Sequence, residues 1–379
     1  MTYTYVATCL FGLEKFVGEE IDALGYKRLE TIDGRVTFEG DIAAIARCNT
    51  WLRCAERVYI KMGEFPARSF TELFDGVKAL PWESWIGKDD AFPVKGHSVR
   101  SALTSIPDCQ SIVKKAIVNR LSEEYGITWF CEEGSKYQID FFILNDKATL
   151  MIDTSGAPLY KRGYRLETGG APLRETLACA IAKVSRPREG ILFWDPFCGS
   201  GTIPTEAALL MTNTAPGLFR EFAAQDFYDI DPRVWSDAKE EALSLQKLDT
   251  SFEAYASDID PNMIEATKAN LCRAGMDKHV RTFVKDAREI AAGGMKGSII
   301  CNPPYGERLM TPFQARNLYS EMGATFAKLT NWQIYVLTSE ERFEQFYGKK
   351  ADKVRKLYNG MLKCNLYQFY KPTQADKHK

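Results

Sequence analysis

This 379-residue sequence is poor in histidine, in closely paired cysteines and in long apolar runs. It contains 3 His and 10 Cys, and no two cysteines have a CxxC spacing, so neither a zinc site nor a disulfide framework is indicated. No apolar run is long enough to cross a bilayer, and the start MTYTYVATCLFGLEKF lacks the basic opening and sustained apolar centre of a signal peptide. We therefore expect a cytoplasmic protein with no metal and no membrane partner.

An excess of charge of either sign is absent as well. The chain has 49 Lys and Arg against 50 Asp and Glu, a formal net charge of −1, so bulk charge gives no sign of a nucleic-acid partner. A polyanion would need a local patch, and the segment 95–120 is the best place for one because Asp108 is its only carboxylate. Its basic residues include Lys95, Arg100, Lys114 and Lys115. A merely solvated basic helix face explains the same residues, and both interpretations stay open.

Changes of pattern divide the chain into three blocks, as its length of 379 residues leads one to expect. Residues 1–60 alternate short apolar strands with amphipathic helices, which predicts a small α+β unit. Residues 61–165 contain the helix QSIVKKAIVNRLSEEYG and a hairpin expected to turn at Asn145 and Asp146. From 166 to 379 strands and helices alternate, which predicts a parallel sheet with helices on both faces.

The first strand of the last block, ILFWD, leads into the loop PFCGSGT and then into an apolar helix. Gly199 and Gly201 would let a ligand approach the backbone at the helix N-terminus. Such a loop is common in α/β proteins and is weak evidence alone. Because it has neither the third glycine of a GxGxxG fingerprint nor the lysine of a P-loop, NAD and ATP are disfavoured as ligands.

Acidic residues follow the next two expected strands. Asp258, at the end of FEAYASD, is placed to accept hydrogen bonds from both hydroxyls of a ribose. Asp260 is better placed to cap the helix that starts near Pro261. Asp286 follows the strand RTFVK, where its carboxylate is placed to accept from an adenine amino group. Taken alone, it is equally explained as an ordinary loop aspartate.

The fourth strand ends in CNPPYGERL, residues 301–309. Two prolines forbid both a continuing strand and a regular helix, so the loop is rigid and poor in donors. One explanation is structural, because Pro-Pro followed by Tyr-Gly is an ordinary way to end a strand. The other is chemical: the Asn302 oxygen and the Pro303 carbonyl would hold the amino group of a flat base on which Tyr305 stacks. Four such strand tips open on one crevice of a parallel sheet, and their combination favours the chemical explanation.

The series DPFCGSGT, SDIDP, KDA and NPPYGERL resembles the motifs of class I S-adenosylmethionine (SAM)-dependent methyltransferases that methylate amino groups. The segment YKRGYRLETGGAPLRETLACAIAKVS resembles the connection between the RNA-binding and catalytic halves of bacterial THUMP-domain guanine-N2 RNA methyltransferases. The order of the first two blocks is also similar to that family. Asp258 follows the glycine loop much later than a dinucleotide fold requires, and the long stretch between them resembles the family's inserted segment.

The resemblance implies a fold, a division of the chain and a function. The fold class is α/β, with a C-terminal Rossmann-like class I methyltransferase sheet preceded by an α+β ferredoxin-like segment and a THUMP domain. The implied domains are a ferredoxin-like segment (1–60), a THUMP RNA-binding domain (61–165) and a class I SAM-dependent methyltransferase domain (166–379). The implied function is methyl transfer from SAM to the exocyclic N2 of a guanine in RNA, first of all 23S ribosomal RNA.

Roles for particular residues are implied in the same way. SAM would be bound by Asp195, Phe197, Gly199, Gly201, Thr202, Asp258, Ile259, Asp286, Ala287 and Asn302. The catalytic loop would be Asn302, Pro303, Pro304 and Tyr305, and the RNA-binding residues would be Lys95, Arg100, Lys114, Lys115, Arg162 and Arg165. No strong base is needed, because the donor is already activated and positioning supplies most of the effect. The roles of Glu307 and Arg308 and the oligomeric state stay open.

Other functions fit parts of the same sequence. The same chemistry on tRNA is a near neighbour, since THUMP domains also occur in tRNA enzymes. DNA adenine-N6 methylation shares the NPPY motif, but the first two blocks do not resemble a DNA target-recognition domain. A non-catalytic RNA-binding scaffold would have no need to keep all four motifs. An NAD-linked oxidoreductase would require that nicotinamide cofactors bind and SAM does not.

Overall fold

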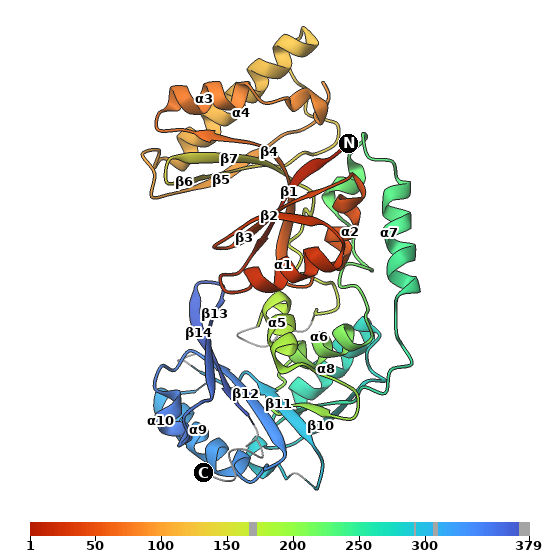
Figure 1. The fold of residues 1–379 in the computed structure, drawn as a ribbon, viewed down its shortest axis with the longest axis vertical. Helices are drawn as coiled ribbons and strands as arrows, with labels where there is room; N and C mark the ends of the chain where they lie inside the picture. The colour runs from red at the N-terminus through yellow and green to blue at the C-terminus, as the bar shows by residue number, and fades with distance from the viewer. Residues whose placement is uncertain (167–172, 292, 306–309, 371–379) are drawn as a thin grey trace. The chain divides into compact units, whose positions relative to one another are not determined.

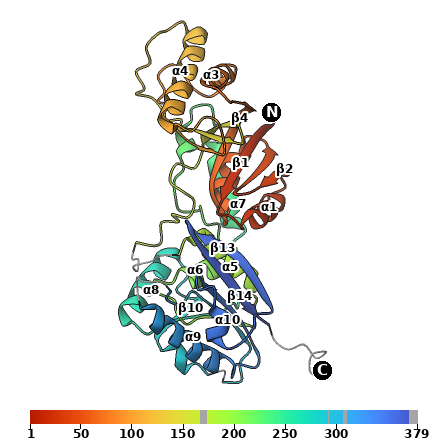
Figure 2. The same cartoon turned by 90° about the vertical axis from the view of Figure 1, so that its left-hand side faces the viewer.

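A run of three buried side chains, Tyr5, Val6 and Ala7, forms the middle of β1 (Tyr3–Cys9), an interior strand of the first sheet. Seven strands form this sheet in the order β2-β3-β1-β4-β7-β6-β5. The other elements of this part are α1 (Glu14–Ala23), β2 (Lys27–Ile32), β3 (Arg35–Gly40), α2 (Ala43–Trp51), β4 (Ala55–Pro66), α3 (Phe70–Lys78), η1 (Trp82–Ser84), β5 (Val94–Val99), α4 (Ile106–Tyr125), β6 (Ile139–Leu144) and β7 (Lys147–Asp153). Figures 1 and 2 both show α3 and α4 side by side next to these strands.

The predicted hairpin is confirmed in this sheet. β6 and β7 pair antiparallel with Leu144 opposite Lys147. Between them Asn145 and Asp146 have φ values of 50° and 64°. Two consecutive positive φ values suit the two-residue turns that Asn and Asp favour, because their twist matches that of the strands.

The second sheet has the order β10-β9-β8-β11-β12-β14-β13. Its first five strands are parallel, and β14 and β13 add an antiparallel hairpin at one edge. The elements that follow β7 along the chain are α5 (Glu175–Ser185), β8 (Leu192–Asp195), α6 (Thr202–Met211), η2 (Ala223–Asp226), α7 (Arg233–Ser244), β9 (Ala254–Asp258), α8 (Pro261–Ala274), β10 (Val280–Val284), η3 (Ala287–Glu289), β11 (Gly297–Cys301), α9 (Pro312–Phe326), β12 (Trp332–Thr338), α10 (Phe343–Tyr347), β13 (Lys353–Asn359) and β14 (Leu362–Phe369). Figure 1 shows the sheet between α5, α6 and α8 on one face and α9 and α10 on the other, so the predicted parallel sheet is confirmed.

The strand order reverses between β8 and β11. From β8 the chain moves outward through β9 and β10, then returns to pair β11 with the other edge of β8 and continues to β12. Ligands of open α/β sheets bind outside the carboxyl ends of the strands at such a reversal. Asp195 is the last residue of β8 and Asn302 directly follows β11, so two of the predicted site residues stand there.

This computed structural model describes residues 1–166, 173–291, 293–305 and 310–370, and the contacts divide the chain into two compact units. The first unit comprises Met1–Cys9, Val17–Leu159 and Arg220–Glu241, and the second comprises Leu10–Phe16, Tyr160–Phe219 and Ala242–Lys379. The inserted segment thus belongs largely to the first unit, where Phe227 stacks on Tyr137 with ring centroids 4.0 Å apart. The finer division into 1–60, 61–165 and 166–379 stays a prediction.

Candidate active site

The glycine loop after β8 needs glycine at two positions for different reasons. Gly199 and Gly201 both have positive φ, 53° and 81°. A Cβ at Gly201 would lie 2.6 Å from the Thr267 Cγ2 atom, so close packing against α8 excludes a side chain there. A Cβ at Gly199 would meet nothing within 4 Å. The open space at Gly199 is what a ligand needs to approach the backbone.

Asp258 ties the end of β9 to this loop. Its Oδ2 atom accepts the N–H of Gly199 at 3.0 Å, and its Oδ1 atom accepts the N–H of Asp260 at 3.0 Å. The Asp260 carboxylate caps α8 by accepting the N–H of Asn262 at 2.8 Å, as predicted. Between the two acids lies Ile259, whose side chain is 63% exposed. A large apolar side chain that is exposed next to Asp258 is available to pack on a flat ring.

Two polar residues of α8, Thr267 and Asn270, form hydrogen bonds to the glycine loop. Neither was predicted from the sequence. The Thr267 hydroxyl donates to the Gly199 carbonyl at 2.7 Å, and the Asn270 amide donates to the Ser200 carbonyl at 2.9 Å. Both side chains are fully buried. The only signal in the sequence was the presence of polar residues three apart on the apolar face of a helix.

Asp195, Phe197 and Thr202 complete the loop. Asp195 is buried, and burial, with a smaller contribution from Asp258, raises the pKa of its carboxyl well above the usual value. Its Oδ1 atom accepts the N–H of Phe197 at 3.0 Å. The Thr202 hydroxyl accepts from Arg165 at 3.0 Å. These side chains brace the loop, and their contact with SAM stays a prediction.

Asp286 lies at the tip of the third strand in a position suited to holding a turn. Its Oδ1 atom accepts the N–H of Arg288 at 2.9 Å and caps η3. The Arg288 side chain also binds both carboxylate oxygens, and this pairing lowers the pKa of Asp286. The next residue, Ala287, is buried in the core. Any contact of Asp286 with adenine would therefore share the carboxylate with Arg288.

The NPPY loop carries an acceptor with nothing bound to it. In the part of the chain that the structure describes, the Asn302 Oδ1 atom is buried and has no hydrogen-bond partner. Buried polar atoms are almost always paired, so an orphaned carbonyl oxygen calls for a ligand. The Tyr305 hydroxyl is 3.8 Å from the Cys364 sulfur, and burial raises the pKa of Tyr305 above its usual range. Glu307 and Arg308 lie outside the described residues.

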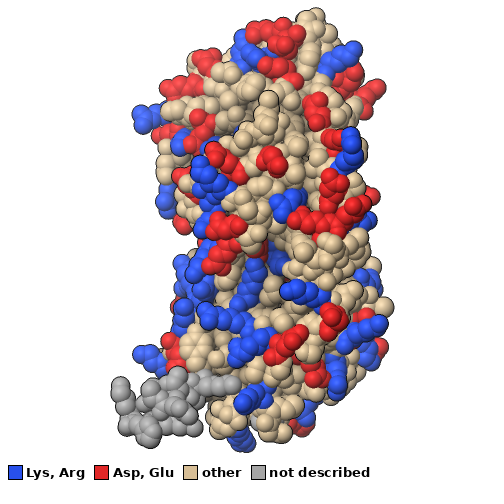
Figure 3. Space-filling view, turned by 45° about the vertical axis from the view of Figure 1, so that its right-hand side comes forward, with Lys and Arg blue, Asp and Glu red and all other residues tan. Residues whose placement is uncertain are grey.

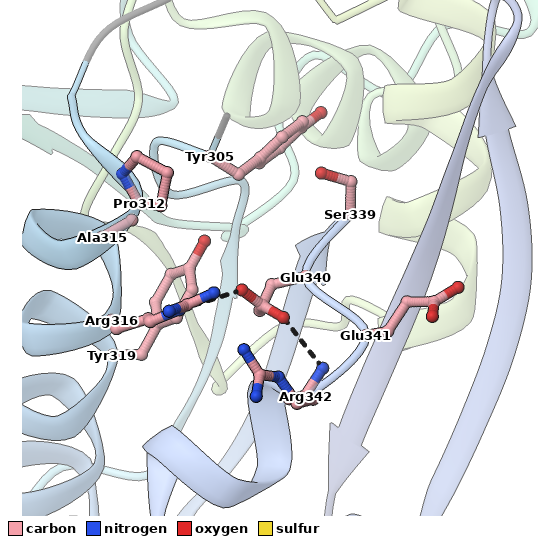
Figure 4. Close-up of a pocket in the computed structure, with 9 residues that line it drawn as sticks. All are labelled: Tyr305, Pro312, Ala315, Arg316, Tyr319, Ser339, Glu340, Glu341 and Arg342. Carbon is pink, nitrogen blue, oxygen red and sulfur yellow. Dashed lines mark hydrogen bonds and ion pairs between the residues drawn. The ribbon is translucent and has the colours of Figure 1, made fainter. Parts of the chain in front are cut away.

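A pocket of about 430 Å³ opens beside Tyr305 (Figure 4). It is lined by Tyr305, Pro312, Ala315, Arg316, Tyr319, Ser339, Glu340, Glu341 and Arg342. In Figure 4 the Glu340 carboxylate lies between two arginines: it forms an ion pair with Arg316 at 3.5 Å and accepts the N–H of Arg342 at 3.1 Å. The pocket thus combines aromatic walls with acceptors and donors, as sites for small planar ligands do.

The predicted RNA-binding residues do not share one environment. Lys95, Arg100 and Lys115 are exposed in the first unit. Lys114 is half-buried: its ammonium group pairs with Glu132 and lies 3.4 Å from the centroid of the Phe92 ring. Desolvation lowers the pKa of Lys114. Its charge is therefore largely engaged within the protein.

Arg162 is buried and Arg165 is half-buried. Arg162 is 6% exposed and forms an ion pair with Glu206, and Arg165 pairs with Glu175 and donates to the Leu173 carbonyl. Both guanidinium groups thus have partners within the protein, and their RNA-binding role stays a prediction. On the upper part of the face drawn in Figure 3, acidic and basic side chains are interspersed.

The described part of the chain contains neither a cluster of metal ligands nor a helix that could span a membrane. Residues 1–166, 173–291, 293–305 and 310–370 contain no group of three or more His, Cys, Asp or Glu side chains that would hold a metal ion. Over these same ranges, none of the helices has the length and apolar character of a membrane span.

Family models match three successive parts of the chain. The RlmL ferredoxin-like domain matches residues 4–59, the THUMP domain matches residues 67–153, and the RMKL-like methyltransferase domain matches residues 162–368. The fold class and the family expected from the motifs are confirmed by these matches.

Individual proteins are similar over most of the chain. YpsC of Bacillus subtilis (strain 168), named as a candidate RNA methyltransferase, is 42% identical over all of this chain and 98% of its own. The ribosomal RNA large subunit methyltransferase K/L of Aliivibrio salmonicida (strain LFI1238) is 34% identical over 95% of this chain but only 52% of its own, so the chain spans about half the length of that relative. The structure of SMU.472, described as a candidate methyltransferase in complex with SAH, is 41% identical with a TM-score of 0.92 and covers 98% of this chain and 99% of its own.

Proposed function

This chain belongs to the RMKL-like methyltransferase family, and from that premise we propose that it uses SAM to methylate the exocyclic N2 of a guanine in large-subunit ribosomal RNA. The similar SMU.472 structure holds SAH, the product that SAM leaves after methyl transfer. The THUMP match and the names of the relatives support RNA as the substrate class. Because the K/L relative is about twice as long, the choice of ribosomal RNA belongs to this proposal.

SAM fits the crevice at the strand reversal. The open space at Gly199 would admit the methionine end of the cofactor to the backbone, and the Asp258 carboxylate, which accepts from Gly199, would bind the ribose. The exposed Ile259 side chain would cover the adenine. SAM supplies an electrophilic methyl group, so the residues around it need to orient the acceptor rather than to activate it.

The buried, unpartnered Oδ1 atom of Asn302 is the observation that carries the proposal. An exocyclic amino group has two hydrogens, and Asn302 together with the Pro303 carbonyl would accept them. Holding both hydrogens turns the nitrogen lone pair away from the ring and toward the methyl group. Tyr305 would stack on the base, a contact worth about 1–3 kcal/mol. The adjoining pocket would receive the guanine once it has left its stack.

Mass spectrometry of nucleosides tests the proposal most directly. Ribosomal RNA, transfer RNA and DNA would be purified separately from cells with the gene, without it, and complemented with Asn302→Ala. We expect N2-methylguanosine to fall in large-subunit RNA without the gene and to stay low with Asn302→Ala. A loss in tRNA alone would keep the chemistry and replace the substrate. A loss of N6-methyladenine from DNA, or no loss anywhere, would overturn the proposal in favour of a DNA enzyme or a scaffold.

A further inference from the structure

The NPPY loop has few backbone hydrogen-bond donors, and α9 supplies one from a side chain. Pro303 and Pro304 have no backbone N–H, so only their carbonyls can fix the loop by hydrogen bonding. The Tyr319 hydroxyl on α9 donates to the Pro304 carbonyl at 3.1 Å. A side-chain O–H from a neighbouring helix thus stands in for the missing backbone donor.

This bond belongs to a series of linked hydrogen bonds. The number of available hydrogens decides which group donates and which accepts in each of them. The Tyr319 Oη atom lies 3.1 Å from the Thr338 Oγ1 atom, which accepts the N–H of Glu340 at 3.1 Å. A carbonyl cannot donate, so the single Tyr319 hydrogen goes to Pro304. Thr338 must therefore donate to Tyr319. The series runs from the Glu340 N–H through the Thr338 and Tyr319 hydroxyls to the Pro304 carbonyl.

The members of this series are held rigidly. Tyr319 is 1% exposed and Thr338 is fully buried. The Tyr319 ring packs edge to face against Phe343, with centroids 5.1 Å apart. Burial also raises the pKa of Tyr319 to about 12, which keeps its hydroxyl protonated at neutral pH. Hydrogen bonds in such a buried series polarise and strengthen one another.

We infer that Tyr319 and Thr338 are positioning residues of the proposed reaction. The Pro304 carbonyl lies in the peptide plane between Pro304 and Tyr305. Because the ring of Pro304 locks its φ, fixing that plane restricts the preceding peptide as well, and so the direction in which the Pro303 carbonyl and Asn302 present their oxygens. The other end of the series is the backbone of Glu340, which lines the pocket beside Tyr305. This series of hydrogen bonds therefore links the catalytic loop to a wall of the pocket proposed to receive the guanine. This inference rests on the proposed function for its chemistry.

Removing single hydroxyls from the full chain tests it. Tyr319→Phe and Thr338→Val should each lower kcat about 10- to 100-fold on an RNA substrate, since misplacement of about 1 Å has effects of that size. The dissociation constant of SAM should change less than about twofold, because neither residue touches the glycine loop. Thr338→Ser keeps the hydroxyl and should restore most of kcat. Tyr347→Phe removes a hydroxyl from the same core cluster and serves as the matched control.

The outcomes separate this inference from the proposed function. Wild-type kcat in Tyr319→Phe, or an equal loss in Tyr347→Phe, would overturn the positioning role. If the wild-type protein itself methylates no RNA, the proposed function fails. Crystal structures of the wild type and Tyr319→Phe still decide the inference in that case: a displaced Pro304 carbonyl supports it, and an unmoved one overturns it.

Discussion

The carboxylate of Asp258 accepts the backbone N–H of Gly199 at 3.0 Å, which joins the tip of β9 to the glycine loop at the end of β8. The same carboxylate is the one proposed to bind the ribose of SAM, so in the proposal it both shapes the loop and holds the ligand. Its neighbour Asp260 has a different task, because it caps α8.

Exchanging these two acids for alanine should separate binding from stability. Asp258→Ala removes the ribose acceptor and the brace of the loop, and we expect the dissociation constant of SAM to rise about 10- to 100-fold, corresponding to about 1.4–2.8 kcal/mol. Asp260→Ala removes only a helix cap, at about 0.5–2 kcal/mol of folding stability. Calorimetric titration with SAM and urea unfolding measure the two effects. Equal losses of affinity in both variants would contradict the assigned division.

Asn302→Ala should abolish methyl transfer and weaken SAM binding much less than Asp258→Ala does, because Asn302 is one of many expected SAM contacts but the proposed holder of the amino group. The Oδ1 atom has no protein partner among the described residues, so its removal breaks no hydrogen bond in the free protein. We expect the stability to change by less than about 1 kcal/mol and the turnover to fall by at least about 100-fold. Single-turnover assays with radiolabelled SAM measure the loss. Substantial retained turnover would remove Asn302 from the proposed role.

RNA affinity should depend on Lys115 and Lys95 but not on Lys114. The charge of Lys114 is already engaged by Glu132, whereas the other two side chains are exposed. Charge reversal at Lys115 or Lys95 should weaken binding and reduce the slope of log K against log[salt] by about 1 for each RNA phosphate that the variant no longer neutralises. Lys114→Gln is the matched control and should leave the slope unchanged. An unchanged slope in all three variants would mean that this face is only solvated.

The strands of the second sheet and the residues at their tips were predictable because both signals are local. An apolar run followed by glycine, an acid or NPPY marks where a strand ends. Parallel strands then bring these ends together at one edge of the sheet. The partners that hold these tips were not predictable. Thr267 reaches Gly199 from another helix, and Tyr319 reaches Pro304 from the helix that follows the loop.

The partners of buried charges were not predictable for a related reason. The sequence shows the charge of Arg162 but not its partner, Glu206, which lies 44 positions later. The inserted segment gives the same lesson. Nothing in its local pattern indicates that Arg220–Glu241 packs with the first unit. Long-range contacts of this kind carry no signature in the periodicity of a single chain.

Alanine at the two loop glycines should give opposite profiles. At Gly201 the added methyl group meets Thr267, a buried side chain that cannot move without losing its bond to Gly199, so we expect about 2–4 kcal/mol of destabilisation. Gly199→Ala has the strain of a positive φ but no clash, at about 1 kcal/mol. Its methyl group would instead enter the space proposed for SAM and weaken binding. Urea unfolding and SAM titration would contradict this if Gly199→Ala bound SAM normally.

The stability of the first unit should depend on pH through Asp140. Burial, and then the neighbouring Asp153, raise the pKa of Asp140 from 3.8 to about 6, against the opposing effects of Arg57, Lys95 and His97. The folded protein keeps the proton to a higher pH than the unfolded chain does. Asp140 therefore costs stability progressively as pH rises from about 4 to 6, and the full cost, on the order of 3 kcal/mol, remains above that range.

Asp140→Asn removes this cost and should raise the unfolding free energy at pH 7.5 by on the order of 2–3 kcal/mol, with little gain at pH 4. The uncharged amide has nearly the same shape, so the packing around β6 is kept. Asp75→Asn, at an exposed position of the same unit, is the matched control and should change stability at neither pH. Urea unfolding across this pH range, followed by fluorescence and circular dichroism, measures both variants. A gain for Asp140→Asn that was the same at pH 4 and pH 7.5 would show that the effect comes from packing and not from the buried charge.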